Sequence, residues 1–381
     1  MKVVVAADSF KGCMTSSQVG EYVKAGIHRY NDAIEVKTFS IADGGEGTVM
    51  AFYETCGGEL VEAACSDAYG KRIHAQYALL DGGQTAVIEV ANIIGLSMVE
   101  RSRRMPLFAS SYGVGMVLKD AIKRGCKRII IGLGGSATND GGMGLLQALG
   151  VLYYDSDHQY LSPQAISLEK VRYIDFNRFH GLGDVELIAA CDVKNKLLGE
   201  NGATYVFGKQ KGLYPTQLKR VDAGMENYRN QIQRYKQVDL NEFEGGGAAG
   251  GIGSVLIGLL NAKMVPGIEL LLSYSKMEED VKDCTFVITG EGQSDAQTAY
   301  GKVPMGILKL AQKYHKPCII LSGALGKGYE VLYEEGFAGI YSIADCAMSF
   351  PQALALAPEK LQAGAYSLIR TIDTFYQGKK D

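Results

Sequence analysis

The feature that most constrains the fold is a short apolar run ending in a glycine-rich or acidic loop, repeated along the 381 residues. Continuous apolar runs of this kind are typical of strands buried on both faces of a parallel sheet. The expected strands are Lys2–Ala7, Val36–Ile41, Arg128–Leu133, Val185–Ala190, Thr285–Thr289, Pro317–Leu321 and Gly339–Ile343. Helical patterns alternate with these runs, so the sequence predicts an α/β fold.

Helix start signals and apolar periodicity follow several of the loops. Thr15-Ser16-Ser17-Gln18 fits a capping box ahead of a helix that reaches Tyr30. Further helices are expected from Asn139-Asp140 to Leu149, from Thr216 to Tyr235, and from Ala357-Pro358-Glu359 to Tyr376. Residues 245–262 carry no charge but include seven glycines, which predicts a buried glycine-rich loop entering a helix rather than a membrane span.

The middle of the chain has a different pattern of apolar and polar residues. Residues 59–80 and 84–90 alternate apolar and polar side chains, as antiparallel strands do, and residues 151–161 resemble a hairpin. We therefore expect two α/β domains. One is a discontinuous parallel-sheet domain of residues 1–58 and 284–381. The other is an inserted mixed α/β domain, residues 59–283, which contains the longest glycine-rich loop.

Composition excludes several classes of protein. Lys plus Arg is 39 and Asp plus Glu is 42, so no basic field would attract nucleic acid. The eight cysteines form neither C-x-x-C nor zinc-binding spacings, which favours buried thiols in a reducing compartment. The apolar run after Lys2 is too short for a signal peptide. We expect a soluble, cytoplasmic protein without a membrane partner.

The strongest motif is the loop that follows Arg128–Leu133. It reads GLGGSATNDGG over residues 132–142, where a segment with five glycines and small hydroxyl residues connects the end of a strand to a helix start. Glycines let backbone N–H groups approach a phosphate, and a helix N-terminus favours an anion. A tight turn packed against a neighbouring backbone is the alternative. Neither a Walker A loop nor the protein-kinase loops occur, and the G-x-G-x-x-G at residues 245–250 lacks a preceding strand.

Acidic and basic side chains gather where the other expected strands end. The positions are Asp8, Ser9 and Lys11; Asp43 and Glu46; Asp192; and Glu291, Asp295 and Lys302. Ligands bind beyond the carboxyl ends of parallel strands, so these loops are the expected site. Carboxylates suit Mg²⁺ and lysine suits a phosphate or carboxylate. The five histidines lie outside these loops, which argues against a histidine base.

Taken together, these motifs resemble the type-1 glycerate kinase family over nearly the whole chain. The blocks that carry the resemblance are ADSFKG (7–12, with Ala6 ahead), IADGGEGT, IEVANIIGL, GLGGSATNDGGMGLLQALG, ACDVKN, NGATYVFGKQKG, GGGAAGGIG, TGEGQSDAQTAYGKVP and SGALG. The resemblance implies ATP-dependent phosphorylation of D-glycerate to 2-phosphoglycerate, with Mg²⁺. It also implies two α/β domains, one Rossmann- or flavodoxin-like, with the site in the cleft between them. Cys13, Lys194 and Lys209 depart from the usual pattern.

For phosphoryl transfer we predict the following roles. ATP phosphates contact Gly134, Gly135, Ser136, Ala137, Thr138, Asn139 and Asp140. Substrate contacts come from Asp8, Ser9, Lys11 and Glu291, and Mg²⁺ ligands from Asp43, Glu46 and Asp192. The catalytic set is Lys11, Asp192, Asp295 and Lys302: the lysines neutralise the γ-phosphate or the glycerate carboxylate, and Asp295 or Asp8 accepts the hydroxyl proton.

Four alternatives stay open. The enzyme could phosphorylate the 3-hydroxyl of glycerate or another small hydroxy acid. The GLGGSA segment is similar to the phosphate loop of GHMP kinases, although there the other blocks have no counterpart. A non-catalytic binding protein and a flavodoxin-like redox protein complete the set. Oligomeric state is not determined by the sequence.

Overall fold

The computed structural model describes residues 1–377, and these divide into two compact units. Unit 1 contains Met1–Asp43, Met50–Cys56 and the chain from Ile268 onward, and unit 2 contains Gly44–Val49 and Gly57–Gly267. The return to unit 1 therefore comes before the predicted residue 284. The reason is that Ile268 packs on Gly306 of unit 1, and the following helix α10 (Met277–Asp283) packs against β1 and α11.

Among the described residues, unit 1 is built on a five-stranded parallel sheet in the order β15-β13-β11-β1-β2. The strands are β1 (Lys2–Ala7), β2 (Glu35–Ser40), β11 (Phe286–Thr289), β13 (Cys318–Ser322) and β15 (Gly339–Ser342). When the five strands are numbered along the chain, their order in the sheet is 2-1-3-4-5, which is the flavodoxin-like order. The strand order reverses between β1 and β11, and this position is the switch point of the sheet. The family resemblance is compatible with a Rossmann-like or a flavodoxin-like sheet, and the strand order decides for the flavodoxin-like sheet.

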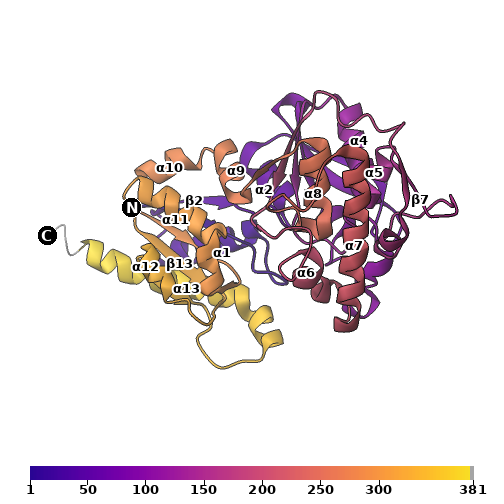
Figure 1. Cartoon of the computed structure of the whole chain (residues 1–381). Helices are drawn as coiled ribbons and strands as arrows, with labels where there is room; N and C mark the ends of the chain where they lie inside the picture. Colours follow the sequence, from indigo (N-terminus) through magenta and orange to yellow (C-terminus); the bar gives the residue numbers. More distant parts are fainter. Residues whose placement is uncertain (378–381) are drawn as a thin grey trace. The chain divides into compact units, whose positions relative to one another are not determined.

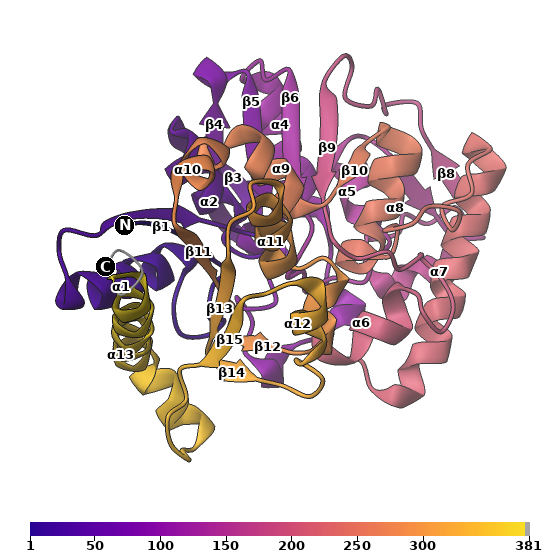
Figure 2. The ribbon, with the colours of Figure 1, turned by 90° about the vertical axis from the view of Figure 1, so that its left-hand side faces the viewer.

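Helices cover both faces of this sheet (Figure 2). On one face α1 (Ser16–Tyr30) and α13 (Phe350–Gln377) lie side by side and bury Val3 and Val5. On the other face α11 (Val303–Lys313) packs against β1, β11 and β13. The remaining elements of the unit are α2 (Thr48–Cys56), which starts in unit 2, α9 (Gly267–Tyr274), α12 (Val331–Glu335), the 3₁₀ turn η5 (Ala296–Tyr300), and the short strands β12 (Gln293–Ser294) and β14 (Ala324–Leu325).

The capping box at Thr15 is confirmed, with Thr15 and Gln18 bonding to each other's backbone N–H groups. The predicted start of α13 at Pro358 is wrong, because the helix begins at Phe350 and Pro358 lies inside it. Proline has no N–H, so the carbonyl of Leu354, four residues earlier, loses its helical donor. The Cys13 thiol donates to that carbonyl at 3.1 Å. A side chain from another element thus makes the interior proline tolerable.

Unit 2 contains the magenta part of the chain (Figure 1), and it is built on a sheet in the order β10-β9-β6-β5-β4-β3, whose strands are labelled in Figure 2. Its strands are β3 (Glu59–Ser66), β4 (Arg72–Leu80), β5 (Thr85–Glu89), β6 (Arg128–Gly132), β9 (Glu186–Ala190) and β10 (Lys263–Val265). The neighbours β5, β6, β9 and β10 are parallel, whereas β3 and β4 pair antiparallel, as the alternating pattern predicts. A cluster of buried apolar side chains spans these strands and the helices packed on them.

The helices of unit 2 are α3 (Ala91–Ile94), α4 (Tyr112–Lys123), α5 (Met143–Ala148), α6 (Ala203–Lys211), α7 (Pro215–Lys236) and α8 (Ala248–Leu260). Its 3₁₀ turns are η1 (Asp81–Gly83), η2 (Arg101–Arg103), η3 (Pro106–Phe108) and η4 (Ala165–Lys170). The hairpin predicted at residues 151–161 is reduced to an isolated bridge between Tyr154 and Tyr160. The reason is that β7 (Leu152–Tyr154) pairs with the later strand β8 (Tyr173–Asp175).

Glycine-rich segments of unit 2 pack directly on each other. A Cβ at Gly250 would lie 2.1 Å from the carbonyl oxygen of Thr138, and one at Gly251 would lie 2.7 Å from Gly141 Cα. Both positions also have positive φ. The glycines at the start of α8 are therefore needed for close backbone contact with the loop that follows β6. Within residues 1–377, no helix is both long enough and apolar enough to cross a membrane.

Candidate active site

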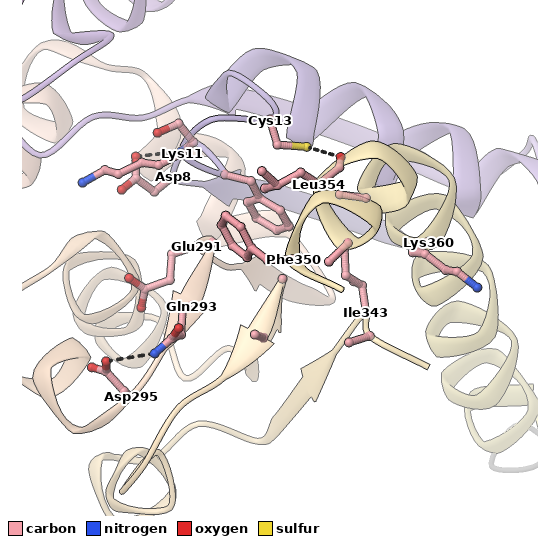
Figure 3. Close-up of a pocket in the computed structure, with 18 of the residues that line it drawn as sticks. Asp8, Lys11, Cys13, Glu291, Gln293, Asp295, Ile343, Phe350, Leu354 and Lys360 are labelled. Atoms are coloured by element: carbon pink, nitrogen blue, oxygen red, sulfur yellow. Dashed lines mark hydrogen bonds between the residues drawn. The ribbon is translucent and has the colours of Figure 1, made fainter. Parts of the chain in front are cut away.

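A cavity of about 460 Å³ lies in unit 1, where its parallel strands end (Figure 3). The loops after β1, β2, β11, β13 and β15 all contribute to its wall, and the start of α13 closes another side. The loops meet here because all five strands run in the same direction. The backbone N–H of Asp8 donates to the carbonyl of Gly290 at 2.8 Å, so the first of these loops is joined to the loop after β11 at the switch point.

One end of the cavity is charged. Asp8 lies there with Lys11, Asp43 and Glu291, and its Oδ1 accepts the backbone N–H of Ser9 at 2.7 Å. Partial burial raises the pKa of Asp8 to about 7, helped by the negative charges of Asp43 and Glu291 and opposed by Lys11. A carboxyl group with a pKa near neutrality can both take and return a proton under physiological conditions.

Glu291 and Lys302 form an ion pair at the same end. Lys302 Nζ lies 3.4 Å from Glu291 Oε2, while the other carboxylate oxygen accepts the hydroxyls of Ser294 at 3.2 Å and Thr298 at 2.6 Å. Glu291 is buried, but more than a third of the Lys302 side chain is exposed, at 37%. The glutamate is thus fixed from one side and the ammonium group remains accessible at the N-terminus of α11.

Asp295 also lines the cavity, but its carboxylate has a structural task. Oδ1 accepts the backbone N–H of Gln297 at 2.8 Å, and the Asp295 N–H donates to the Thr298 hydroxyl at 3.1 Å. These bonds form a capping box for the 3₁₀ turn η5. Its other oxygen, Oδ2, accepts the side-chain amide of Gln293 at 3.5 Å, so both carboxylate oxygens of Asp295 are engaged within the protein. Asp8, whose pKa is raised to about 7, is the better placed of the two predicted proton acceptors.

The glycine-rich loop of unit 2 is mostly removed from solvent. Gly134 and Gly135 reach the surface, but the N–H of Gly134 already donates to the carbonyl of Gly44 at 3.0 Å. The following five predicted nucleotide contacts are all buried: Ser136, Ala137, Thr138, Asn139 and Asp140. Any phosphate that binds from solvent therefore has access to the first residues of the loop rather than to its whole length.

Asp140 holds that loop together from inside. Its carboxylate accepts the backbone N–H and the hydroxyl of Ser111, both at 2.7 Å, and the backbone N–H groups of Gly142 and Gly144. Burial nevertheless raises the pKa of Asp140 above its ordinary value. Four hydrogen bonds to a side chain with no exposed surface indicate a structural anchor at this position.

Lys211, at the end of α6, is a second anchor, and sequence reasoning missed it. Its ammonium group donates to the Ser136 hydroxyl at 2.9 Å and to the Thr138 carbonyl at 2.6 Å. Burial lowers the pKa of Lys211 to about 7. The residue belongs to the GKQKG segment, where nothing distinguishes it by pattern from its exposed neighbour Lys209.

The loop that contains Glu46 is held by another buried carboxylate. Glu89 accepts the backbone N–H groups of Gly47 at 3.0 Å and Val49 at 3.1 Å, and burial raises its pKa to about 7. Glu89 ends strand β5, so the rule that found Asp8 and Asp192 at strand ends would have found it too. Asp192 itself accepts the backbone N–H of Gly267 at 3.1 Å, at the residue where unit 2 ends.

The three predicted metal ligands come from both units. Among residues 1–377, no group of three or more His, Cys, Asp or Glu side chains is arranged to hold a metal ion. Asp43 belongs to the charged end of the cavity in unit 1, whereas Glu46 and Asp192 belong to unit 2. Mg²⁺ in phosphate-binding sites commonly uses only one or two carboxylates, with phosphates and waters completing its shell.

Comparison with known proteins identifies the family. Residues 3–373 match the Glycerate kinase family. The chain belongs to the glycerate kinase family. It is 38% identical to the glycerate kinase of Halalkalibacterium halodurans over 96% of this chain and 97% of that protein. It is 37% identical to the glycerate 2-kinase of Escherichia coli K12 over 90% of each chain.

A solved structure agrees with this assignment to the glycerate kinase family. A crystal structure assigned as glycerate kinase 2 from Salmonella typhimurium LT2 matches 99% of both chains, with a TM-score of 0.83 and 35% identity. The α/β fold and the resemblance drawn from the motifs are confirmed, and the protein is a kinase. Sequence reasoning also missed the apolar residues of the cavity, since Phe350 and Leu354 belong to a helix turn that it had left outside α13.

Proposed function

We propose that the protein transfers the γ-phosphoryl group of ATP to the 2-hydroxyl of D-glycerate, releasing 2-phosphoglycerate and ADP. The observation that carries this proposal is the charged end of the unit 1 cavity, where Asp8 lies beside two lysines at the carboxyl ends of a parallel sheet. The names of the relatives support glycerate as the acceptor.

In the proposed reaction the 2-hydroxyl oxygen forms a bond to the γ-phosphorus, and the bond from that phosphorus to the β,γ-bridging oxygen breaks. The hydroxyl proton passes to a carboxylate oxygen of Asp8, and ADP carries away the electron pair. Lys302 and Lys11 neutralise the γ-phosphate and the glycerate carboxylate. Positioning and charge neutralisation dominate this chemistry because the transition state is loose, with little covalent work for the protein.

The residues present fit Mg²⁺ as the metal. Asp43 offers carboxylate oxygens next to Asp8, and its negative charge raises the Asp8 pKa, so a divalent cation there would relieve repulsion between the two acids. When bound, the metal would neutralise phosphate charge. We propose Asp43 as its principal protein ligand, and Glu46 and Asp192 stay predictions as further ligands.

We propose that the glycine-rich loop of unit 2 contributes to phosphate binding through the exposed backbone of Gly135, because the N–H of Gly134 is already bonded to the Gly44 carbonyl. The buried network of Asp140 and Lys211 would then keep that backbone rigid. This follows because preorganised backbone N–H groups need no rearrangement when the ligand binds. The prediction that the substrates meet in a cleft between two domains stays a prediction.

The test is to incubate the purified protein with ATP, Mg²⁺ and D-glycerate and to record a ³¹P NMR spectrum. The phosphorus of 2-phosphoglycerate couples to one ester proton and that of 3-phosphoglycerate couples to two, so a doublet is expected rather than a triplet. A triplet would retain the kinase and move the reaction to the 3-hydroxyl. A folded protein that forms neither product would overturn the proposal and favour another hydroxy acid or a non-catalytic binding role.

A further inference from the structure

Part of the unit 1 cavity has no use in binding glycerate. D-Glycerate is a three-carbon acid with no substantial apolar surface, whereas the cavity volume of about 460 Å³ is typical of sites for much larger ligands. Apolar side chains line much of the rest of the cavity, and those of Ile343, Phe350 and Leu354 lie away from Asp8 and Lys11 in Figure 3. We call this apolar lining the apolar lobe, and it consists of Phe10, Ile343, Met348, Phe350, Leu354 and Ala357. The Lys360 side chain, which is paired with Asp345, also borders the cavity.

The apolar lobe contains both buried side chains and one exposed aromatic ring, that of Phe350. Phe10, Ile343 and Ala357 are buried, so the floor is part of the hydrophobic core. Phe350, the first residue of α13, is 74% exposed although its side chain lines the cavity. In Figure 3 its ring lies between Leu354 and the strand that carries Gln293. An exposed ring at the edge of an apolar cavity is a surface on which a planar aromatic group can stack.

We infer that the apolar lobe holds the purine base of the nucleotide. The inference deepens the proposed function, on which it rests, by assigning the base to a site in unit 1. The cavity has matching chemistry along its length, since an apolar compartment leads to an end where the accessible ammonium of Lys302 can meet phosphate charge. The cavity also lies at the carboxyl ends of the strands, beside the switch point between β1 and β11. Parallel sheets with this strand order bind their ligands at that position.

A matched pair of phenylalanines on one helix allows a direct test. Phe350→Ala removes the ring at the cavity, and Phe375→Ala removes a ring on the same helix α13 that is similarly exposed, at 72%. Loss of base stacking weakens binding by about tenfold, on the scale measured for aromatic platforms. We expect Phe350→Ala to raise the Kd for ADP, measured by calorimetry, by about that factor, and Phe375→Ala to leave it within twofold of the wild type.

Separate measurements with nucleotide and with D-glycerate distinguish a failure of this inference from a failure of the proposed function. The KM for ATP should rise in Phe350→Ala while the KM for D-glycerate stays within twofold. Because the calorimetric titration uses ADP alone, it reports on the lobe even if no phosphoglycerate forms. An unchanged Kd for ADP in an active Phe350→Ala enzyme would overturn the inference and leave the proposed function intact. An equal rise in both KM values would also overturn it.

A photolabel locates the base independently of any substitution. The wild-type protein is irradiated with 2-azido-ADP, digested and mapped by mass spectrometry, with excess ADP as the competitor. We expect competed label in the peptide that spans residues 343–357, and loss of that label in Ala353→Trp, which would fill the lobe. Competed label confined to residues 132–142 of unit 2 would place the base there and refute the assignment.

Discussion

The two units both bring a carboxylate and a lysine to loops that follow parallel strands, but they bury them differently. In unit 1, Asp8 and Lys302 line a cavity and part of each group remains accessible. In unit 2, Asp140 has no exposed surface and Lys211 is 3% exposed, so both are confined to hydrogen bonds within the protein. The same residue types therefore line an accessible cavity in one unit and brace a loop in the other.

The pKa values of Asp8 and Lys211 are both shifted by burial, but with different consequences in the two units. Burial and neighbouring carboxylates raise the pKa of Asp8 to about 7, while burial lowers that of Lys211 to about 7. In both cases folding disfavours the charged form. Under the proposed mechanism, a substrate proton or a cation would remove this unfavourable charge in unit 1. In unit 2 it is a lasting cost of holding the glycine-rich loop in place.

The largest effect is expected for Asp8→Asn. The amide cannot accept the hydroxyl proton, so kcat should fall by about 10²- to 10⁴-fold in steady-state assays. The folded-state pKa of Asp8 lies above its unfolded value, so its contribution to stability decreases as pH rises from about 4 to 7. Asp8→Asn should therefore be far less active than the wild type yet more resistant to urea at pH 8.

The control for Asp8→Asn is Asp32→Asn, which changes an exposed carboxylate in a turn of the same unit. Its kcat should match the wild type. A kcat for Asp8→Asn within threefold of the wild type would contradict the role of Asp8 and return attention to Asp295.

Lys302→Met tests whether the accessible cation of unit 1 acts on phosphate. Loss of one preorganised positive group should reduce kcat by about 10²-fold. Glu291 keeps the hydroxyls of Ser294 and Thr298, so the fold should survive, as circular dichroism would show. Lys309→Met, on the exposed side of the same helix, supplies the comparison. Equal activity in the two variants would show that Lys302 only neutralises Glu291.

Lys211→Met tests the bracing role in unit 2 through stability. The folded-state pKa of Lys211 is lowered, so the unfolded chain binds the proton between about pH 7 and pH 10 and the folded protein does not. Because of Lys211, the free energy of unfolding of the wild type should increase by up to about 1.4 kcal/mol for each pH unit between pH 7 and pH 10. Lys211→Met should lack the gain, whereas the exposed Lys209→Met should keep it. Parallel urea titrations from pH 7 to 9.5 measure the difference, and identical slopes in the two variants would exclude it.

The smallest effect is expected at the hydrogen bond from Cys13 to Leu354. Cys13→Ala should cost about 0.5–1 kcal/mol in the free energy of unfolding, the usual net value of one such bond. Cys13→Ser retains a donor and should stay close to the wild type. In the Cys13→Ala background, Pro358→Ala restores a helical N–H for the Leu354 carbonyl and should recover the loss. A double variant that is less stable than Cys13→Ala would refute this account.

Much of the fold could be predicted because its strands are continuous apolar runs. The strand β1 was placed without error and β6 to within one residue, since burial on both faces leaves an unambiguous pattern. The start of α13 was misplaced because proline usually marks the first turn of a helix. Only the packing of α1 beside α13 brings the Cys13 thiol to the carbonyl that Pro358 leaves without a donor.

The sequence by itself determined the α/β class, the family and the loops where charged residues follow strands, because these depend on local composition and spacing. The tertiary structure alone decided the strand order of unit 1 and which charges are accessible. It separated Lys302 at the cavity from Lys211 in the interior, and it added Phe350 to the wall of the cavity. Burial and contact depend on residues far apart in the chain, and no local pattern records those distances.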